Sequence, residues 1–490
     1  MSRKNLARVM AAVFFASLVP LVLVALYNYP ADDDFRFTLP AARAWVETGS
    51  LAAVWKANWQ HTAEMYATWQ GDFFSTLLFG LNPLVFDIRL YFLSNWAMLA
   101  LLCLCTGYLV KGAARALGAD RTAFWIVYPA VMVLVLQFMP SIAYSIYWHN
   151  GGQYTTAACM LYLAVGLVIR LSLPQTGLRR TLRTLWLCLC CFALGGSFFG
   201  PALGAFVLVL LLTVTAWVKK NRARVPLAMA TLCVAIALII SILAPGNALR
   251  QERTGETAGV LATLVTSVLD SFDLCGAWLS PQLLGMLLLI VPVMWKPLKE
   301  SAYAFRQPLW VVVMLYGLFS ASLAPGIYTG YGYNTARYEN AIYLYFLLWA
   351  IGSALYCEGA FIRYLERAQS ESAGHLLSAA GELGKRFAAL YLAIAVALTA
   401  LGGFAFTIMN TSSAGALKSL VNGEARTFHE EMLERQEYVR VTDSDVVAVK
   451  PLSVAPYVFK NDRLPWQGIY GCVRYMKWYF ELFYNAAQGG

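Results

Sequence analysis

Long apolar segments recur along the chain and alternate with short polar ones. The first, 9–27, is long enough to cross a bilayer core of about 30 Å, because a helix rises about 1.5 Å per residue. Segments of the same character follow at 88–110, 122–138, 153–173, 184–198, 200–218, 225–244, 277–295, 308–325, 341–357 and 387–409. This pattern predicts an all-α polytopic membrane protein with about 11 transmembrane helices.

The stretch 184–218 allows two interpretations. A single long tilted helix is one, and two helices that turn at "GGSFFGP" are the other. Basic clusters flank the stretch on both sides, and they lie on the same face of the membrane only if the chain crosses twice. We therefore expect two helices here.

Composition and charge agree with a membrane protein. Apolar residues make up 59% of the chain and charged residues 13%, whereas soluble domains carry about 25% charged residues. The net charge of +10 does not indicate a nucleic-acid partner, because the basic residues gather in alternate loops and at the N-terminus, with Arg3, Lys4 and Arg8. The positive-inside rule predicts a cytoplasmic N-terminus and, with an odd number of spans, an external C-terminus. A cleaved signal peptide is the alternative for 9–27, but no cleavage site of small residues follows it.

Polar residues concentrate outside the predicted spans. They lie in the first external loop (28–87), in short loops near 139–152, 245–258 and 326–340, and in a tail, 410–490. The sequence thus divides into a transmembrane domain, 1–409, and an external C-terminal segment, 410–490. Because the spans hold almost no ionisable residues, an enzyme or binding protein at the membrane surface is favoured over a transport pathway.

The first external loop predicts helices that lie along the membrane surface. Thr38 and Ser50 are expected N-caps of two of them. Three tryptophans supply side chains that settle at headgroup depth: Trp45, Trp55 and Trp59.

Three consecutive carboxylates, Asp32, Asp33 and Asp34, follow the first span. A solvated loop end or a partner for a helix dipole explains many such runs. Arginines of other external loops offer another explanation, since they could face these carboxylates: Arg250, Arg253 and Arg337. A divalent cation would serve equally well.

Two further loops carry candidate chemistry. In "APGNALR", Pro245 and Gly246 end a span beside Arg250, which makes either an anion cradle or an ordinary turn. The loop "SIAYSIYWHNGGQYTTA" combines aromatic rings with amides, as sugar-binding sites do, although an aromatic belt and a structural His149 explain it too. "YGYNTARYEN" repeats that blend.

Five motifs, in order, resemble the GT-C superfamily of membrane glycosyltransferases, which use polyprenyl-phosphate sugars. They are "ADDDF", "YATWQGDFFSTLLF", "YWHNGGQY", "APGNALR" and "NTARYEN". Within the superfamily, the chain is most similar to bacterial O-antigen-type glucosyltransferases and related bacterial membrane proteins. The resemblance extends over most of the chain, and the order of the motifs rather than any single one makes it specific.

The resemblance implies roles for individual residues. Asp32 and Asp33 are the expected general bases, with Asp34 as their neighbour. The donor phosphate is expected to bind Arg250, Arg253 and Arg337. Superfamily members differ in metal use, so a divalent cation, Mg²⁺ or Mn²⁺ held by the three aspartates, stays open and no other cofactor is expected.

Further residues are expected to bind substrate: Asp34, Trp69, Asp72, Trp148, His149, Asn150, Gln153, Tyr154, Asn247, Tyr333 and Asn334. Asp72 departs from the family pattern, which often has a basic residue after the glycine of "WQGDFF". The tail resembles a small mixed α/β cap, and the alternation in "DVVAVKPLSV" predicts a short strand.

The expected function is therefore transfer of a sugar from a polyprenyl-phosphate donor to a hydroxyl of a cell-envelope glycan or glycolipid. It would take place on the outer face of a bacterial inner membrane, with the C-terminus periplasmic. A flippase or exporter of lipid-linked glycans is the alternative, and a scaffold that only binds glycan is a third.

Overall fold

The computed structural model describes residues 2–31, 33–175, 177–254, 257–368, 408–442, 450–460 and 471–489. All regular structure in these ranges is helical. The longer helices are α1 (Arg3–Val24), α5 (Phe92–Ala116), α6 (Arg121–Met132), α7 (His149–Ser172), α8 (Gly177–Gly195), α9 (Phe199–Val218), α10 (Arg224–Ile242), α12 (Val260–Trp278), α13 (Pro281–Glu300), α14 (Pro308–Ala321) and α16 (Ala336–Ala368).

Eight helical segments of the described ranges are long and apolar enough to cross a membrane, which confirms the prediction of a helical membrane protein. Two shorter apolar segments, Arg121–Gln137 and Pro308–Ala321, coincide with two further predicted spans. The last predicted span, 387–409, lies almost entirely outside the described residues, so the number of eleven stays a prediction. One of the eight, α12, lies mostly between the predicted spans 225–244 and 277–295, where the sequence analysis predicted no span.

The stretch 184–218 forms two helices, α8 and α9, as expected from its flanking charges. The turn between them is held against the start of α4 (Phe73–Phe79), because the Phe74 amide donates to the Gly196 carbonyl at 2.8 Å. Gly196 is required there, since a Cβ atom would lie 2.4 Å from the Phe73 ring.

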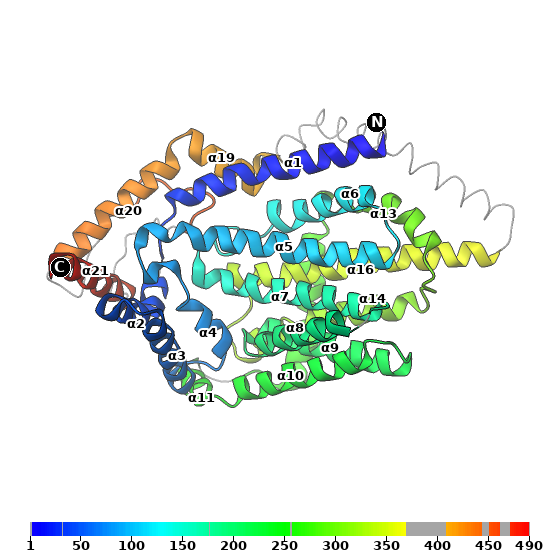
Figure 1. Cartoon of the computed structure of the whole chain (residues 1–490), viewed down its shortest axis with the longest axis horizontal. Helices are drawn as coiled ribbons and strands as arrows, with labels where there is room; N and C mark the ends of the chain where they lie inside the picture. Colours follow the sequence, from blue (N-terminus) through cyan, green and yellow to red (C-terminus); the bar gives the residue numbers. More distant parts are fainter. Residues whose placement is uncertain are drawn as a thin grey trace.

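The long helices run side by side, and a set of shorter ones gathers at one end of the bundle (Figure 1). This set comprises α2 (Asp33–Thr48), α3 (Leu51–Thr68), α4, α11 (Pro245–Thr254) and α21 (Gly471–Gly489). We call this the α2–α3 end. The N-terminus of α1 lies at the opposite end (Figure 1).

The first external loop is helical as predicted, but only one of its two predicted caps is correct. Ser50 caps α3 by accepting a hydrogen bond from the Ala53 amide at 3.4 Å. Thr38 is no cap: it lies fully buried inside α2, which begins at Asp33. The earlier start buries Phe35, whose ring centroid lies 5.4 Å from that of Tyr479 in α21.

The described part of the tail is helical apart from the irregular segment 450–460 and contains no strand, so the expected mixed α/β cap is not found there. Besides α21, the described part of the tail forms α19 (Ser412–Val421) and α20 (Glu424–Val441). The predicted strand falls partly on 443–449, outside the described residues, and 450–454 contains no strand. The Ser413 hydroxyl donates to the Ser17 carbonyl at 2.6 Å, so α19 packs along the middle of α1. The division of the chain at 409/410 stays a prediction.

Candidate functional site

Three guanidinium groups surround the indole ring of Trp69, which follows α3 at the α2–α3 end. Their Cζ atoms lie 5.4 Å (Arg36), 5.1 Å (Arg250) and 5.7 Å (Arg253) from ring centroids of Trp69. An indole face attracts cations, so these contacts hold the three side chains, which come from α2 and α11, in one place. We call Trp69 with these arginines the Trp69 cluster.

Two of the three arginines of the Trp69 cluster, Arg36 and Arg253, have no carboxylate partner within the described ranges. Arg250 donates through Nε to the Tyr331 hydroxyl at 3.0 Å and through Nη1 to Oε1 of Gln70. These hydrogen bonds fix the position of Arg250, and the gathering of three guanidinium groups on one ring suits the cluster to bind an anion.

A cavity of about 500 Å³ opens beside the cluster, between α2, α3, α11 and α21. Its lining includes Arg36, His61, Met65, Trp69, Arg253 and Tyr475. Burial lowers the pKa of His61, although Glu64, 3.5 Å from its Nδ1, raises it. The cavity therefore combines apolar side chains with the carboxylate of Glu64 and the cationic Trp69 cluster.

Beside this cavity, hydrogen bonds of Asn247 join the turn before α4 to the first turn of α11. The Gly71 amide donates to Oδ1 of Asn247 at 2.9 Å, while the Asn247 amide group donates to the Ser241 carbonyl at 2.7 Å. A Cβ atom at Gly246 would lie 2.5 Å from the Trp69 amide nitrogen. Asn247, expected to bind substrate, thus braces the backbone that carries Trp69 and Arg250.

Asp34 does not face the arginines. Its Oδ2 accepts hydrogen bonds from the Tyr91 hydroxyl at 2.6 Å and the Ala31 amide at 3.1 Å. Its Oδ1 accepts from the Asn150 amide at 3.2 Å, at the start of α7. Burial raises the pKa of Asp34 to about 7, although these three hydrogen bonds lower it. Asp34 therefore joins α2 to α5 and α7.

The other two members of the acid run differ from Asp34. Asp33 is half-buried in the first turn of α2, and Asp32 lies outside the described residues. The donors around Asp34 occupy both of its oxygens, which does not fit a metal ligand. Within the described ranges, no group of three or more His, Cys, Asp or Glu side chains could hold a metal ion.

Asp72 lies within electrostatic range of Arg250 and Arg337. Burial raises its pKa to about 7, while the charges of Arg250 and Arg337 lower it. It is 2% exposed, and neither of its oxygens has a hydrogen-bond partner in the described part of the chain. It occupies the N-cap position of α4, but its side chain accepts no capping hydrogen bond from that helix. Asp72 is thus a buried carboxyl whose charged form is favoured by two of the arginines expected to bind phosphate.

Arg337, at the start of α16, lies apart from the Trp69 cluster. Its Cζ is 5.3 Å from the Trp148 ring and 5.6 Å from the Tyr154 ring. Trp148 donates through Nε1 to the Ala31 carbonyl at 3.2 Å, which ties "YWHNGGQY" to the start of α2. Each of the five quoted motifs therefore contacts at least one of the others, although Arg337 and Arg250 approach different aromatic rings.

The other residues that were expected to bind substrate either form hydrogen bonds within the protein or are exposed. His149 is buried and donates through Nε2 to the Leu78 carbonyl at 2.9 Å, and Gln153 donates to the His149 carbonyl at 3.2 Å. Tyr333 donates its hydroxyl to Oδ2 of Asp270 at 2.9 Å. Asn334 is exposed.

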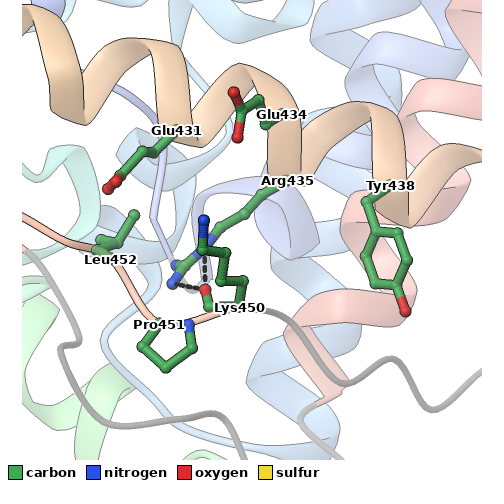
Figure 2. Close-up of a pocket in the computed structure, with 7 residues that line it drawn as sticks. All are labelled: Glu431, Glu434, Arg435, Tyr438, Lys450, Pro451 and Leu452. Carbon is green, nitrogen blue, oxygen red and sulfur yellow. Dashed lines mark hydrogen bonds between the residues drawn. The ribbon is translucent and has the colours of Figure 1, made fainter.

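A second, smaller pocket of about 150 Å³ lies in the tail (Figure 2). Its central group is Arg435 of α20, which donates to the Lys450 carbonyl through Nε at 3.1 Å and Nη2 at 2.6 Å. Glu431 accepts from the Ser453 amide at 2.9 Å. These contacts fasten the segment around Pro451 to α20, so the pocket has a structural role.

The sequence analysis missed Arg36, Gln70 and Tyr331, which complete the Trp69 cluster. Gln70 lies within "YATWQGDFFSTLLF" and Tyr331 begins "YGYNTARYEN". Both residues therefore belong to motifs that the sequence analysis had already singled out. Arg36 gave none, because its role depends on the packing of α2 against α3.

The comparisons with known proteins leave the geometry as the main guide to function. The GT-C resemblance therefore remains an expectation that rests on short motifs. No protein-family model matches this chain, and neither the curated proteins nor the solved structures give a significant match.

Proposed function

We propose that this protein is an integral-membrane glycosyltransferase that moves a sugar from a polyprenyl-phosphate donor to a hydroxyl of a cell-envelope glycan or glycolipid. The α2–α3 end would face the periplasm of a bacterial inner membrane, with the N-terminus in the cytoplasm. The observation that carries the proposal is the Trp69 cluster: three guanidinium groups gathered around one indole ring, at one end of an apolar helical bundle.

A phosphate at the end of a lipid chain matches this arrangement. Its charge would meet Arg36, Arg250 and Arg253, whose planar forks suit phosphate oxygens. Its prenyl chain would lie against the apolar surfaces of the bundle. The cavity of about 500 Å³ beside the cluster offers room for the groups that the phosphate carries.

The chemistry of transfer needs a base and a stabilised leaving group. A carboxylate takes the proton from the acceptor hydroxyl, whose oxygen bonds to the anomeric carbon. The bond from that carbon to the phosphate oxygen breaks, and its electron pair stays on the phosphate, where the arginines stabilise the charge. Asp33 is our candidate base among the described residues, and Asp32 precedes it.

The test uses the full-length protein in proteoliposomes with undecaprenyl-phosphate-linked hexoses and a cell-envelope glycan as acceptor. We expect release of free undecaprenyl phosphate and labelled glycan from the wild type. Asp33→Asn and Asp32→Asn should each abolish transfer, whereas the matched control Glu47→Gln, exposed on the same helix, should not.

Two results would overturn the proposal. Movement of intact lipid-linked glycan across the vesicle without bond cleavage would indicate a flippase or exporter. Glycan binding without release of lipid phosphate, for every hexose tried, would indicate a scaffold. Full activity in the Asp32/Asp33 double variant would remove the base assignment alone.

A further inference from the structure

The C-terminal helix, α21, has no part in the proposed function, yet it forms a wall of the cavity beside the Trp69 cluster. Tyr475 of α21 lines that cavity together with Arg36 of α2 and Trp69, which follows α3. In Figure 1, α21 lies beside α2 at the α2–α3 end, although the two helices lie near opposite ends of the sequence. A helix of the tail therefore reaches the site that we assign to the lipid phosphate.

Buried aromatic residues fix α21 on α2. The ring centroid of Phe35 in α2 lies 5.4 Å from that of Tyr479 in α21. The Tyr479 hydroxyl donates to the Leu84 carbonyl at 2.8 Å, and Tyr479 is 1% exposed. Tyr475 precedes Tyr479 by four residues, about one helical turn, so the two side chains lie on the same side of α21. The packing of α21 on α2 thus places Tyr475 next to Arg36.

Three aromatic rings surround the guanidinium group of Arg36. Its Cζ atom lies 5.4 Å from a ring centroid of Trp69, 5.6 Å from that of Phe37 and 5.8 Å from that of Tyr475. Within the described ranges, the Arg36 side chain has no hydrogen bond and no ion pair. Because aromatic faces attract cations, the rings determine where this guanidinium lies.

Arg36 is thus held in a different way from Arg250, which donates hydrogen bonds to Tyr331 and Gln70. A guanidinium group can contact a ring through its face and keep the N–H donors in its plane for phosphate oxygens. An arginine side chain has many rotamers, so fixing it in advance lowers the entropy that is lost when a ligand binds. The rings can therefore prepare Arg36 for an anion without using its donors.

We propose that Tyr475 is a positioning residue of the phosphate site: its ring holds the Arg36 guanidinium beside the cavity, where Arg36 binds the phosphate of the lipid-linked donor. The inference deepens the proposed function and rests on it for the identity of the ligand. It also gives the tail a role in binding, because α21 completes the site that α2, α3 and α11 begin.

The experiment is a double-mutant cycle on Arg36 and Tyr475. It measures binding of sugar-free undecaprenyl phosphate to the full-length protein in nanodiscs. Tyr475→Leu removes the ring and keeps an apolar side chain, whereas Tyr475→Phe keeps the ring. We expect Tyr475→Leu to weaken binding about threefold, because Arg36 loses a cation–π contact and must be ordered on binding. Tyr475→Phe should restore most of the affinity.

The double variant tests whether Tyr475 acts through Arg36. Arg36→Gln alone should weaken binding about tenfold. Adding Tyr475→Leu to it should cause no further loss, because the ring then has no guanidinium group to hold. Independent contributions would instead multiply to about thirtyfold. A general structural effect of Tyr475 would multiply in the same way, so the cycle distinguishes positioning from damage to the fold.

Tyr484→Leu is the matched control. Tyr484 lies on the same helix, and the Cζ atom of Arg440 lies 4.3 Å from its ring centroid, but neither residue lines the cavity. The same substitution at this second tyrosine–arginine contact should leave binding of undecaprenyl phosphate as in the wild type. Thermal unfolding without lipid checks that both leucine variants fold.

Three results would overturn the inference while transfer of a sugar could stand: wild-type affinity in Tyr475→Leu, equal losses in Tyr475→Leu and Tyr475→Phe, or a multiplied loss in the double variant. Wild-type affinity in Arg36→Gln would remove Arg36 from the phosphate site, and the inference would fall with it. Coupling between Arg36 and Tyr475 in a protein that transfers no sugar would support the inference and overturn the proposed function.

Discussion

The amide of Gly71 donates a 2.9 Å hydrogen bond to the side chain of Asn247, 176 positions away in the sequence. This bond joins the turn that carries Trp69 and Asp72 to the helix that carries Arg250 and Arg253. The position of Arg250 and Arg253 relative to Asp72 therefore depends on the close approach of these two segments at Gly71.

Gly71→Ala should weaken that approach. A Cβ atom at position 71 would lie 1.8 Å from the Ser241 carbonyl oxygen, which is backbone and cannot rotate away. We expect a loss of about 1–3 kcal/mol in the free energy of unfolding, measured by thermal or denaturant unfolding in detergent. Gly276→Ala is the control, because nothing lies within 4 Å of its added Cβ. Equal stability of both variants would contradict the close approach.

Replacing arginines of the Trp69 cluster should weaken binding of lipid phosphate. We expect Arg36→Gln and Arg253→Gln each to reduce affinity for sugar-free undecaprenyl phosphate by about tenfold, since each removes a charged hydrogen-bond donor. Arg426→Gln is the control, because that exposed arginine already pairs with Glu430. The affinity should also fall with rising salt, because Arg253 is exposed. Unchanged affinity in both variants would exclude the cluster as the phosphate site.

Tyr91→Phe should destabilise the fold. The Tyr91 hydroxyl donates to Asp34 and accepts from the His149 amide at 3.1 Å, so its loss leaves two buried groups without that partner. We expect a cost of about 1–3 kcal/mol in unfolding free energy. Tyr364→Phe, at an exposed position, should change stability little. If Tyr91→Phe changed the free energy of unfolding as little as Tyr364→Phe does, the Tyr91 hydroxyl would contribute nothing to stability.

Stability should fall as pH rises from about 4 to about 7, in part because of Asp72. Burial raises its folded-state pKa from 3.8 to about 7, so between these values the folded state keeps a proton that the unfolded state has lost. Stability from this group is complete below the lower value and is lost as pH rises through the upper one. Asp72→Asn should therefore gain stability relative to the wild type across this range, measured as melting temperature against pH. Parallel pH profiles would contradict the shift.

Much of the fold follows from local patterns. Apolar runs predict the long helices, and the basic clusters around "GGSFFGP" correctly predict two helices there. The Ser50 cap is also local and is confirmed. The start of α2 could not be predicted in this way, because it depends on Asp34 meeting Tyr91 and Asn150, which are distant in sequence.

The candidate site was predictable only in its parts. Motif order suggested that Arg250 and Arg337 lie near carboxylates, but no sequence periodicity distinguishes Asp34 from Asp72. Packing does so: α7 and Tyr91 supply donors to Asp34, whereas Asp72 points to a region where the described chain offers none. The same holds for Arg36, which reaches Trp69 only because α2 packs on α3.

The contact of the tail with the first helix has a consequence for shortened forms of the protein. Gln137 accepts from the Ser413 amide at 3.0 Å, beside the bond from Ser413 to the Ser17 carbonyl. Deleting the chain from residue 408 onward would remove the donor that Oε1 of Gln137 has in Ser413. Such a truncation would affect the rest of the fold, because it would expose the side of α1 that packs against α19.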